Sequence, residues 1–483
     1  MSVKIKNNIF LKFLPVVIGI VIFLKEIESV HTHSVETKYI QVPVDHFSPT
    51  EPAKTFNLRY LVYAKNHIKG GPVFVYTGGE RDITVAARHT GFLFDIAPTF
   101  NAMIVFIEHR YYGRSLPFGN TSFASLENLR YCMSTQALSD FAYLLNDLKK
   151  NLSDTSHATG PFIAFGGYYA GTLSALLRLR YPDLIKGAIT SSAPMFYLPG
   201  STSCEDYYKI ATRVFMKYGE ERCVRTIKLA WEIIISISKT KKGMDFISSS
   251  LKLCKDLETP EDVEVLLDWL AETYVKLSMV NYPYSSDYYN PVPANPVLVF
   301  CNKLNTAHFN DTRQFIEMFA AALKIYTNYT GKAICTDIFY KQHNANELAW
   351  QYQTCTELIM PKCSTDYDMF ITKNWNYEDM SLDCYRKYNI KPRPNWAFST
   401  YGGQNLHYYS NVVFSSSMLD PASYNAVYLN KSDDKSKQPW ISYRIEEAPH
   451  LMEFRTSDRT DNSYIIKARN FYVSTIKNWL NQK

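Results

Sequence analysis

The sequence predicts an α/β fold in which a mostly parallel sheet carries helices on both faces and a helical, disulfide-bonded domain is inserted. Up to about residue 195, short apolar runs alternate with amphipathic stretches. The middle of the chain has helical periodicity and holds most of the cysteines, and the alternating pattern resumes after about residue 400. The 483 residues exceed what one compact core usually holds, which also favours an insertion.

Residues 1–29 predict an export signal. Lys4 and Lys6 precede an apolar run over residues 10–24, which has the length of a signal-peptide core and is short for a membrane span. The alternative, an uncleaved anchor, stays open. No later run is long enough to cross a bilayer, so after cleavage we expect no membrane association.

The first part of the α/β domain is expected over residues 30–199. Short apolar runs bounded by Gly, Pro or Asn predict buried strands at 72–76, 102–107, 161–165 and 187–190. Between the second and third of these runs, residues 136–150 place apolar side chains at helical spacing. Strand–helix–strand alternation of this kind predicts parallel strands with helices on both faces.

The insertion is expected over residues 200–399, with helices such as 263–277. The second part of the α/β domain then covers residues 400–483. It contains predicted strands at 411–415 and 440–445 and a closing helix at 465–480.

Eight of the nine cysteines lie between residues 204 and 384, an even set that predicts four disulfides in the inserted module. The spacing leaves the pairing open and lacks the paired C-x₂-C and H-x₃-H pattern of a zinc site, so we expect no metal and no cofactor. Cys132 is left over and is predicted to be a buried free thiol. The eight are Cys204, Cys223, Cys254, Cys301, Cys335, Cys355, Cys363 and Cys384.

Five N-x-S/T sequons agree with export, since glycosylation of such sites takes place on surface loops in the secretory pathway. The net charge of +6 is not gathered in a dense Lys/Arg stripe, so nucleic acid is not an expected partner. The sequons start at Asn120, Asn151, Asn310, Asn328 and Asn430.

The segment most informative about chemistry is Phe-Gly-Gly-Tyr-Tyr-Ala-Gly-Thr over residues 165–172. An apolar strand enters a turn of small residues and a helix follows from about Thr172, which is the context of a nucleophile elbow with the pattern G-x-S-x-G. Small residues flank a nucleophile because the strand and helix backbones approach closely there. In this chain Tyr168 stands where that pattern has the serine, and Ala170 stands where it has the closing glycine.

Two later residues follow the order in which such hydrolases place their acid and base. Asp420 comes after the predicted strand 411–415, and His450 comes after the predicted strand 440–445. Loops just past strand ends are where α/β sheets collect catalytic groups. On position alone, Asp420 is equally a turn residue before Pro421, and His450 one of eleven histidines.

Longer motifs resemble the peptidase family of lysosomal Pro-X carboxypeptidase and its dipeptidyl-peptidase relatives, from about Tyr39 to the C-terminus. They include Tyr-Thr-Gly-Gly-Glu-Arg-Asp-Ile over 76–83, Glu-His-Arg-Tyr-Tyr-Gly-Arg-Ser over 108–115 and Thr-Cys-Thr-Glu-Leu-Ile-Met-Pro over 354–361. The resemblance implies an α/β-hydrolase domain with a helical cap, and cleavage next to proline. It places the nucleophile position at Tyr168, the acid at Asp420 and the base at His450.

The resemblance also shows departures around the site. It assigns Tyr169 and Gly78 to the oxyanion region and puts Thr172 and Ala422 where the family has a Met and a Trp of its pocket. Arg81 replaces the glycine of the family's Asn-Glu-Gly-Asp motif, close to where an oxyanion hole is built. Ser174 lies in the following helix and Ser191 and Ser192 lie after the next strand, so none of them can occupy the elbow, and they are interpreted as structural.

The leading hypothesis is therefore a secreted or lysosomal homologue that no longer cleaves, and that binds peptides or proteins with proline near a terminus. One alternative is an active Pro-X carboxypeptidase or dipeptidyl peptidase that uses another nucleophile, or whose true sequence carries serine at the elbow. A second is a non-catalytic binding or storage protein that uses only its surface. A homodimer is a candidate assembly for each of them.

Overall fold

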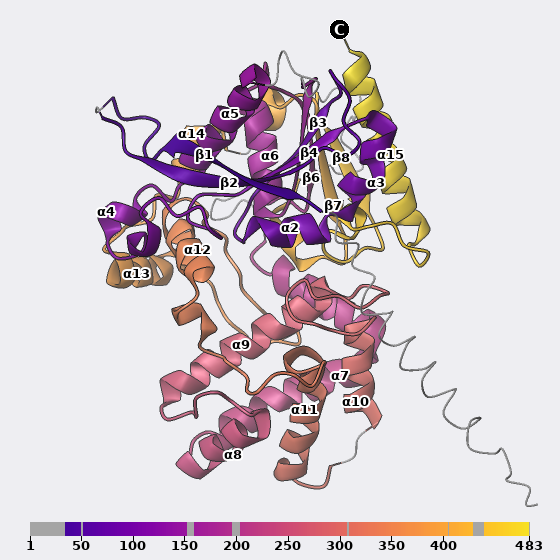
Figure 1. Ribbon diagram of the computed structural model, residues 1–483. Helices are drawn as coiled ribbons and strands as arrows, with labels where there is room; N and C mark the ends of the chain where they lie inside the picture. Colours follow the sequence, from indigo (N-terminus) through magenta and orange to yellow (C-terminus); the bar gives the residue numbers. More distant parts are fainter. Residues whose placement is uncertain are drawn as a thin grey trace, which may run out of the picture.

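The computed structural model describes residues 34–49, 52–151, 159–195, 203–306, 309–403, 405–427 and 439–482. An α/β layer occupies one end of the molecule and a group of helices the other (Figure 1). The export signal expected at 1–29 and the sequon at Asn430 lie outside the described residues.

A single eight-stranded sheet runs in the order β1-β2-β4-β3-β5-β6-β7-β8. β1 pairs antiparallel with β2, and β2 antiparallel with β4, while all remaining pairs are parallel. The predicted, mostly parallel sheet is thus confirmed. The strands are β1 (Glu36–Pro43), β2 (Thr55–Tyr63), β3 (Val73–Thr77), β4 (Met103–Ile107), β5 (Phe162–Gly167), β6 (Ile185–Ser191), β7 (Val412–Ser417) and β8 (Ile441–Ile445).

The two antiparallel strands, β1 and β2, were not expected from the sequence. In β2 the polar residues Asn57 and Arg59 interrupt the apolar run. β1 lies at the edge of the sheet, and Val42 is its only buried residue. An edge strand of this kind carries polar side chains and lacks the continuous apolar run by which the buried strands were predicted.

Helices cover both faces of the sheet. Successive side chains of a strand point to opposite faces, so both faces carry apolar side chains that pack against helices. Phe74 of β3 packs in one apolar cluster with α3 and α15, whereas its neighbours Val73 and Val75 pack in another with α5 and α6. The helices of the α/β layer are α2 (Ile83–His89), α3 (Gly91–Phe100), α4 (Leu126–Leu129), α5 (Ser134–Asn151), α6 (Tyr169–Arg180) and α15 (Ser463–Asn481), with short 3₁₀ turns η1 (Gly119–Thr121), η3 (Leu406–Tyr408), η4 (Pro421–Asn425) and η6 (Met452–Phe454).

Between β6 and β7 the chain forms the cap. Helices α7 to α11 make the separate helical group, whereas α12 and α13 lie beside the α/β layer (Figure 1), where they pack on Tyr111 and Tyr112. The helices are α7 (Asp206–Ile237), α8 (Lys241–Leu251), α9 (Pro260–Met279), α10 (Pro296–Thr306), α11 (Thr312–Thr327), η2 (Tyr340–Gln342), α12 (Ala345–Thr356), α13 (Tyr377–Tyr388) and α14 (Trp396–Tyr401).

Four disulfides tie the cap together, and they use the eight cysteines that the sequence singled out. Cys132 is unbonded and buried. Across the described ranges, no helix is long and apolar enough to cross a membrane. The bonds are Cys204–Cys363, Cys223–Cys301, Cys254–Cys335 and Cys355–Cys384.

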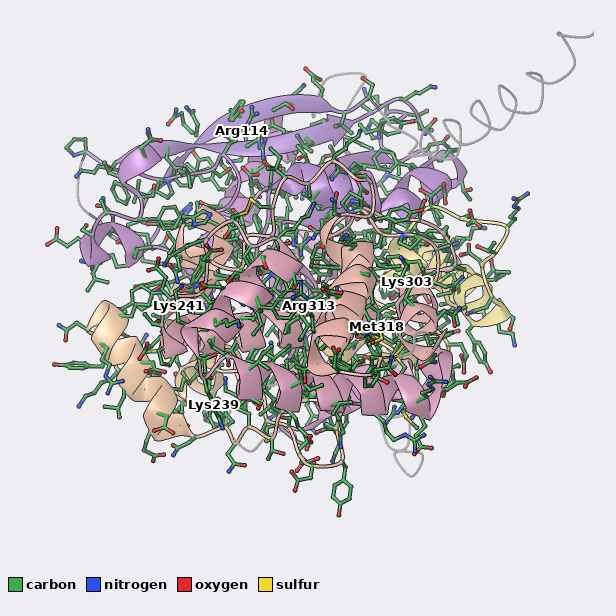
Figure 2. All side chains as sticks on the ribbon, turned by 90° about the horizontal axis from the view of Figure 1, so that it is seen from below. Arg114, Lys239, Lys241, Lys303, Arg313 and Met318 are labelled. Carbon is green, nitrogen blue, oxygen red and sulfur yellow. A yellow bond between two sulfur atoms is a disulfide. The ribbon has the colours of Figure 1, made fainter. Side chains whose placement is uncertain are left out.

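Basic side chains are spread over the cap when it is seen from below, as Lys241, Lys303 and Arg313 show (Figure 2). Two of them form ion pairs along their own helices. Lys241 contacts Asp245 at 2.8 Å and Arg313 contacts Glu317 at 3.1 Å. The two acidic partners therefore partly neutralise the positive charges of Lys241 and Arg313.

Candidate active site

The turn between β5 and α6 holds Tyr168 in a strained backbone conformation, with φ 53° and ψ −127°. A positive φ is costly for a residue with a large side chain and persists only where neighbours impose it. One such neighbour is Gly166, where a Cβ would lie 2.2 Å from the carbonyl oxygen of Ala170. The main-chain N–H of Tyr168 donates to the carbonyl of Ser191 at 2.8 Å. The turn therefore has the geometry of a nucleophile elbow.

Asp420 and His450, thirty residues apart in the chain, meet beside this elbow. His450 Nδ1 lies 2.8 Å from Asp420 Oδ2, and both side chains are buried. The other carboxylate oxygen of Asp420 accepts the N–H of Ala422 at 2.9 Å. The Tyr282 hydroxyl donates to the carbonyl of His450 at 2.6 Å, so the cap fixes the histidine backbone. This is the arrangement in which a carboxylate orients an imidazole base.

The Tyr168 side chain extends from the elbow towards the cap. Its ring centroid lies 6.3 Å from that of His450, edge to face, and 6.0 Å from that of Trp350 in α12. Its hydroxyl lies 3.7 Å from the sulfur of Met360. The phenol thus occupies space beside the histidine and carries its oxygen to Met360 of the cap.

The other predicted site residues lie around the elbow at different depths. Tyr169 is buried, and its hydroxyl lies 3.1 Å from His109 Nε2 and accepts the Gln353 amide at 2.9 Å. Thr172 donates from its hydroxyl to the carbonyl of Pro194 at 2.7 Å. Gly78 faces the end of β4, since a Cβ there would lie 2.4 Å from the carbonyl oxygen of Ile107.

A small hollow, partly open to solvent, adjoins the elbow. Neither Gly78, Thr172 nor Ala422 lines it, whereas the next glycine, Gly79, does. Burial raises the pKa of the Glu80 carboxyl in its wall. Lining residues include Tyr76, Gly79, Glu80, Arg81, His89, Gly167, Ala170 and Tyr288.

Arg81 connects the α/β domain to the cap at this hollow. Its guanidinium lies 4.8 Å and 4.3 Å from the ring centroids of Tyr288 and Tyr289, and its Nη1 donates to the carbonyl of Tyr288 at 3.0 Å. The Tyr288 ring in turn lies 5.8 Å from that of His450. Cation–π contacts of this kind hold the cap segment that contains Tyr288 and Tyr289 beside the imidazole of His450.

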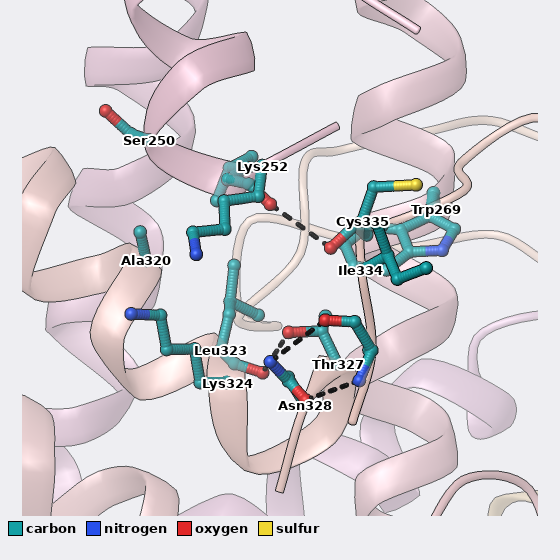
Figure 3. A pocket seen from close by; sticks show the side chains of 13 residues that line it. Ser250, Lys252, Trp269, Ala320, Leu323, Lys324, Thr327, Asn328, Ile334 and Cys335 are labelled. Atoms are coloured by element: carbon teal, nitrogen blue, oxygen red, sulfur yellow. Dashed lines mark hydrogen bonds between the residues drawn. The ribbon is translucent and has the colours of Figure 1, made fainter. Parts of the chain in front are cut away.

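A second small hollow lies within the cap and is lined by parts of α8, α9 and α11 (Figure 3). Trp269 and Leu323 form apolar parts of its wall. The Asn328 side-chain amide closes one side by bonding both the N–H and the carbonyl of Ala333. None of the predicted catalytic residues lines this hollow.

Several cap residues at the site were missed by the sequence reasoning: Tyr207, Tyr288, Trp350, Gln353, Glu357 and Met360. They come from the insertion, where helical periodicity identifies buried faces but not which of them docks on the elbow. The run over 354–361, which resembles the family, is the signal nearest to Gln353, Glu357 and Met360.

A buried polar network joins the elbow to the cap. Gln353 links the hydroxyl of Tyr169 to the carboxyl of Glu357, at 2.9 and 2.7 Å. Glu357 accepts the N–H of Ser134, the first residue of α5, at 2.8 Å, and its hydroxyl at 2.7 Å. Burial, only partly offset by these bonds, raises the pKa of Glu357 to about 7.

Chemically, the arrangement offers an oriented imidazole base and a strained turn without a serine. In the part of the chain that the structure describes, no group of His, Cys, Asp or Glu side chains could hold a metal ion.

The family model described as serine carboxypeptidase S28 matches residues 42–472. The chain belongs to this family. It is 39% identical over 445 residues to lysosomal Pro-X carboxypeptidase of Homo sapiens, covering 92% of this chain and 88% of that protein. It is 32% identical over 475 residues to the prolyl carboxypeptidase-like protein 5 of Caenorhabditis elegans, covering 94% and 92%.

The fold is an α/β-hydrolase domain with a disulfide-bonded helical cap, as the family resemblance implied. An epoxide hydrolase from Vigna radiata is a looser structural match, with a TM-score of 0.38 and 12% identity over 92% of this chain and 98% of that one. Membership of the S28 family supports a serine exopeptidase-type function.

Proposed function

We propose that this protein is a non-cleaving member of the S28 family that binds peptides or proteins with proline near a terminus. The observation that carries the proposal is the position of Tyr168: a phenol stands at the elbow, beside an Asp420–His450 pair that remains assembled.

A tyrosine at this position is poorly placed for attack on an amide. Its oxygen lies at the far end of the ring, near Met360, and not at the Cβ where a serine carries its hydroxyl. Correct positioning of reacting groups contributes about 7–11 kcal/mol to such reactions. An attacking atom displaced by the length of a phenol ring forfeits most of that contribution.

Of the three nearby serines, Ser174 and Ser191 are engaged in buried hydrogen bonds, whereas the buried hydroxyl of Ser192 has no hydrogen-bond partner among the described residues. Ser174 Oγ lies 2.7 Å from Thr77 Oγ1 and donates to the carbonyl of Ala170 at 3.1 Å. Ser191 donates to Glu453 at 2.5 Å. These bonds support the structural interpretation of both residues.

The second candidate function is an active serine-type Pro-X carboxypeptidase or dipeptidyl peptidase. The buried 2.8 Å contact between Asp420 and His450 favours it, because an oriented base is what a nucleophile requires. The third candidate function is that of a storage or binding protein that uses only its surface. This function predicts that no peptide binds in the cleft.

Labelling with a fluorophosphonate probe separates the first two functions. We expect no stoichiometric labelling of the protein and no change on His450→Ala, because no serine is activated by the pair. Labelling that reaches one probe per chain and disappears in His450→Ala would establish an active nucleophile. Calorimetry with proline-containing peptides tests the third function, and we expect measurable binding.

We also propose that the protein works in the secretory pathway, either secreted or in the lysosome. The four disulfides support this, since they form in oxidising compartments. Among the sequons, Asn120, Asn151 and Asn310 are exposed and are the best-placed glycosylation sites. Asn328 is half-buried, with its amide bonded to Ala333, and is the least accessible of the four described ones.

A further inference from the structure

Arg81 places a half-buried guanidinium in the wall of the small hollow beside the elbow. Its Nη1 donates to the carbonyl of Tyr288 at 3.0 Å, and its other N–H groups have no acceptor among the described residues. Within the same residues it forms no ion pair with a carboxylate. The rings of Tyr288 and Tyr289 contact the guanidinium through their faces, so they do not use these N–H groups. Nε and Nη2 therefore remain available to a ligand.

Two carboxyl groups line the same hollow, but neither is an ion-pair partner of Arg81. Asp82 is paired with Arg59, whose Nη2 lies 2.7 Å from Asp82 Oδ1. Glu80 is next to Arg81 in the chain, and burial raises the pKa of its carboxyl, which weakens it as a partner for a cation. A guanidinium with free in-plane N–H groups and no carboxylate partner is suited to bind an anion.

The hollow extends from this arginine to the elbow and has several apolar walls. Gly167 and Ala170 of the elbow line it, so a side chain of a peptide that lies over the elbow can enter it. Further walls come from the buried side chains of Tyr76, Leu451 and Phe454. Apolar walls with one cationic group match a side chain that has an aliphatic stem and a terminal carboxylate, as in glutamate.

We propose that Arg81 binds an acidic side chain of a peptide held in the cleft, so that this protein selects ligands with Glu or Asp beside the proline. The inference rests on the proposed function and adds the class of side chain that is recognised. It concerns a property of this chain and not of its family, because the resemblance puts an uncharged glycine at position 81. Nε and Nη2 form the side of the guanidinium fork that donates two parallel hydrogen bonds to one carboxylate.

The test compares two pairs of peptides by calorimetry on the full-length protein at neutral pH. The pairs are Ala-Glu-Pro-Ala with Ala-Gln-Pro-Ala, and Ala-Pro-Glu with Ala-Pro-Gln, which put the acid on either side of the proline. Both members of a pair have the same termini, so their difference reports on the side chain alone. In at least one pair we expect the Glu peptide to bind at least about tenfold more tightly, as a hydrogen bond to a charged group predicts.

Arg81→Met should remove the preference for Glu over Gln, whereas a change in the position of the cap alone would weaken both members of a pair equally. Arg81→Lys keeps the charge but loses the planar fork, so it should retain part of the preference. Arg88→Met is the matched control, because this exposed arginine of α2 lies 3.7 Å from Asp287 and does not line the hollow. It should leave the preference unchanged, and melting curves check that each variant is folded.

The outcomes separate the inference from the proposed function. Equal binding of Glu and Gln peptides in both pairs overturns the inference and leaves the proposed function standing, as does a preference that survives in Arg81→Met. A preference that is lost in Arg88→Met as well would show a general effect of positive charge and also overturns the inference. Absence of binding by all four peptides contradicts the proposed function, and the inference falls with it.

Discussion

At the scale of single residues, the elbow keeps its backbone geometry without its serine. The positive φ of Tyr168 is imposed by neighbours that have no room for larger side chains. A Cβ at Gly167 would lie 2.5 Å from Leu451, and one at Gly171 2.8 Å from the carbonyl oxygen of Gly166. The strain that presents a nucleophile is thus a property of the packing around the turn and persists when the nucleophile is replaced.

Restoring the serine alone should not restore an enzyme. In Tyr168→Ser, the Ala170 methyl and the Arg81 side chain remain where the resemblance places smaller residues near the oxyanion site. One oxyanion donor is worth about 10²–10³ in kcat. We therefore expect peptide turnover at least about 100-fold below that of a variant combining Tyr168→Ser with Ala170→Gly and Arg81→Gly. Equal rates in a hydrolysis assay would show that the two neighbours do not matter.

At the scale of elements, two departures from the family pattern meet where β3 ends and α6 begins. A Cβ at Gly79 would lie 3.1 Å from the nitrogen and 3.3 Å from the methyl carbon of Ala170. The family motif has Asn where this chain has Gly79, and Gly where it has Ala170. Gly79 therefore makes room for the methyl group that Ala170 adds, and the two changes compensate each other.

A double-mutant cycle tests this pairing. Gly79→Asn should lower the free energy of unfolding by about 1–3 kcal/mol, because it crowds the start of α6. Its cost should shrink by at least about 1 kcal/mol when Ala170→Gly is present, since contacting residues couple by 0.5–3 kcal/mol. Urea unfolding measures each corner of the cycle. Gly331→Asn, at an open position, is the control and should be additive with Ala170→Gly; additivity for Gly79 as well would refute the pairing.

Which parts of the fold and of the site could be predicted from the sequence depends on the type of element that carries them. The buried parallel strands and the positions of Tyr168, Asp420 and His450 followed from apolar runs, chain order and motif. Met360 and Trp350 did not, because they enter the site through the docking of the cap, which depends on contacts between residues far apart in the sequence. Thr172 and Ala422 were assigned to the pocket by resemblance; in the structure the Thr172 hydroxyl donates to the carbonyl of Pro194, and the Ala422 N–H donates to Asp420.

At the scale of the whole molecule, a carboxyl group helps to join the α/β layer to the cap. Glu357, at the C-terminal end of α12, accepts hydrogen bonds at the N-terminus of α5 through Ser134. The Ser134 hydroxyl also lies 2.8 Å from that of Tyr401 in α14. The carboxyl is buried, and its pKa is raised to about 7. Proton binding and the attachment of the cap are therefore coupled at this residue.

This coupling predicts how stability depends on pH. Between about pH 4.5 and 7, folded Glu357 holds a proton that the unfolded chain releases, so its contribution falls as pH rises, by roughly 3 kcal/mol in all. Glu357→Gln keeps a side-chain acceptor for Ser134 but cannot ionise. The stability of the parent protein relative to this variant should therefore decrease across the window and be level below and above it.

The difference between the two unfolding curves is the required measurement, because other groups act in the same window. Burial lowers the pKa of His89 to about 2 and of His109 to about 4, so both make stability increase with pH up to about 6.5. These contributions are common to both proteins and cancel in the difference. A difference that does not change between pH 4.5 and 7 would contradict the role of Glu357. A decrease would indicate that this junction is most stable in an acidic compartment, in line with the proposed lysosomal alternative.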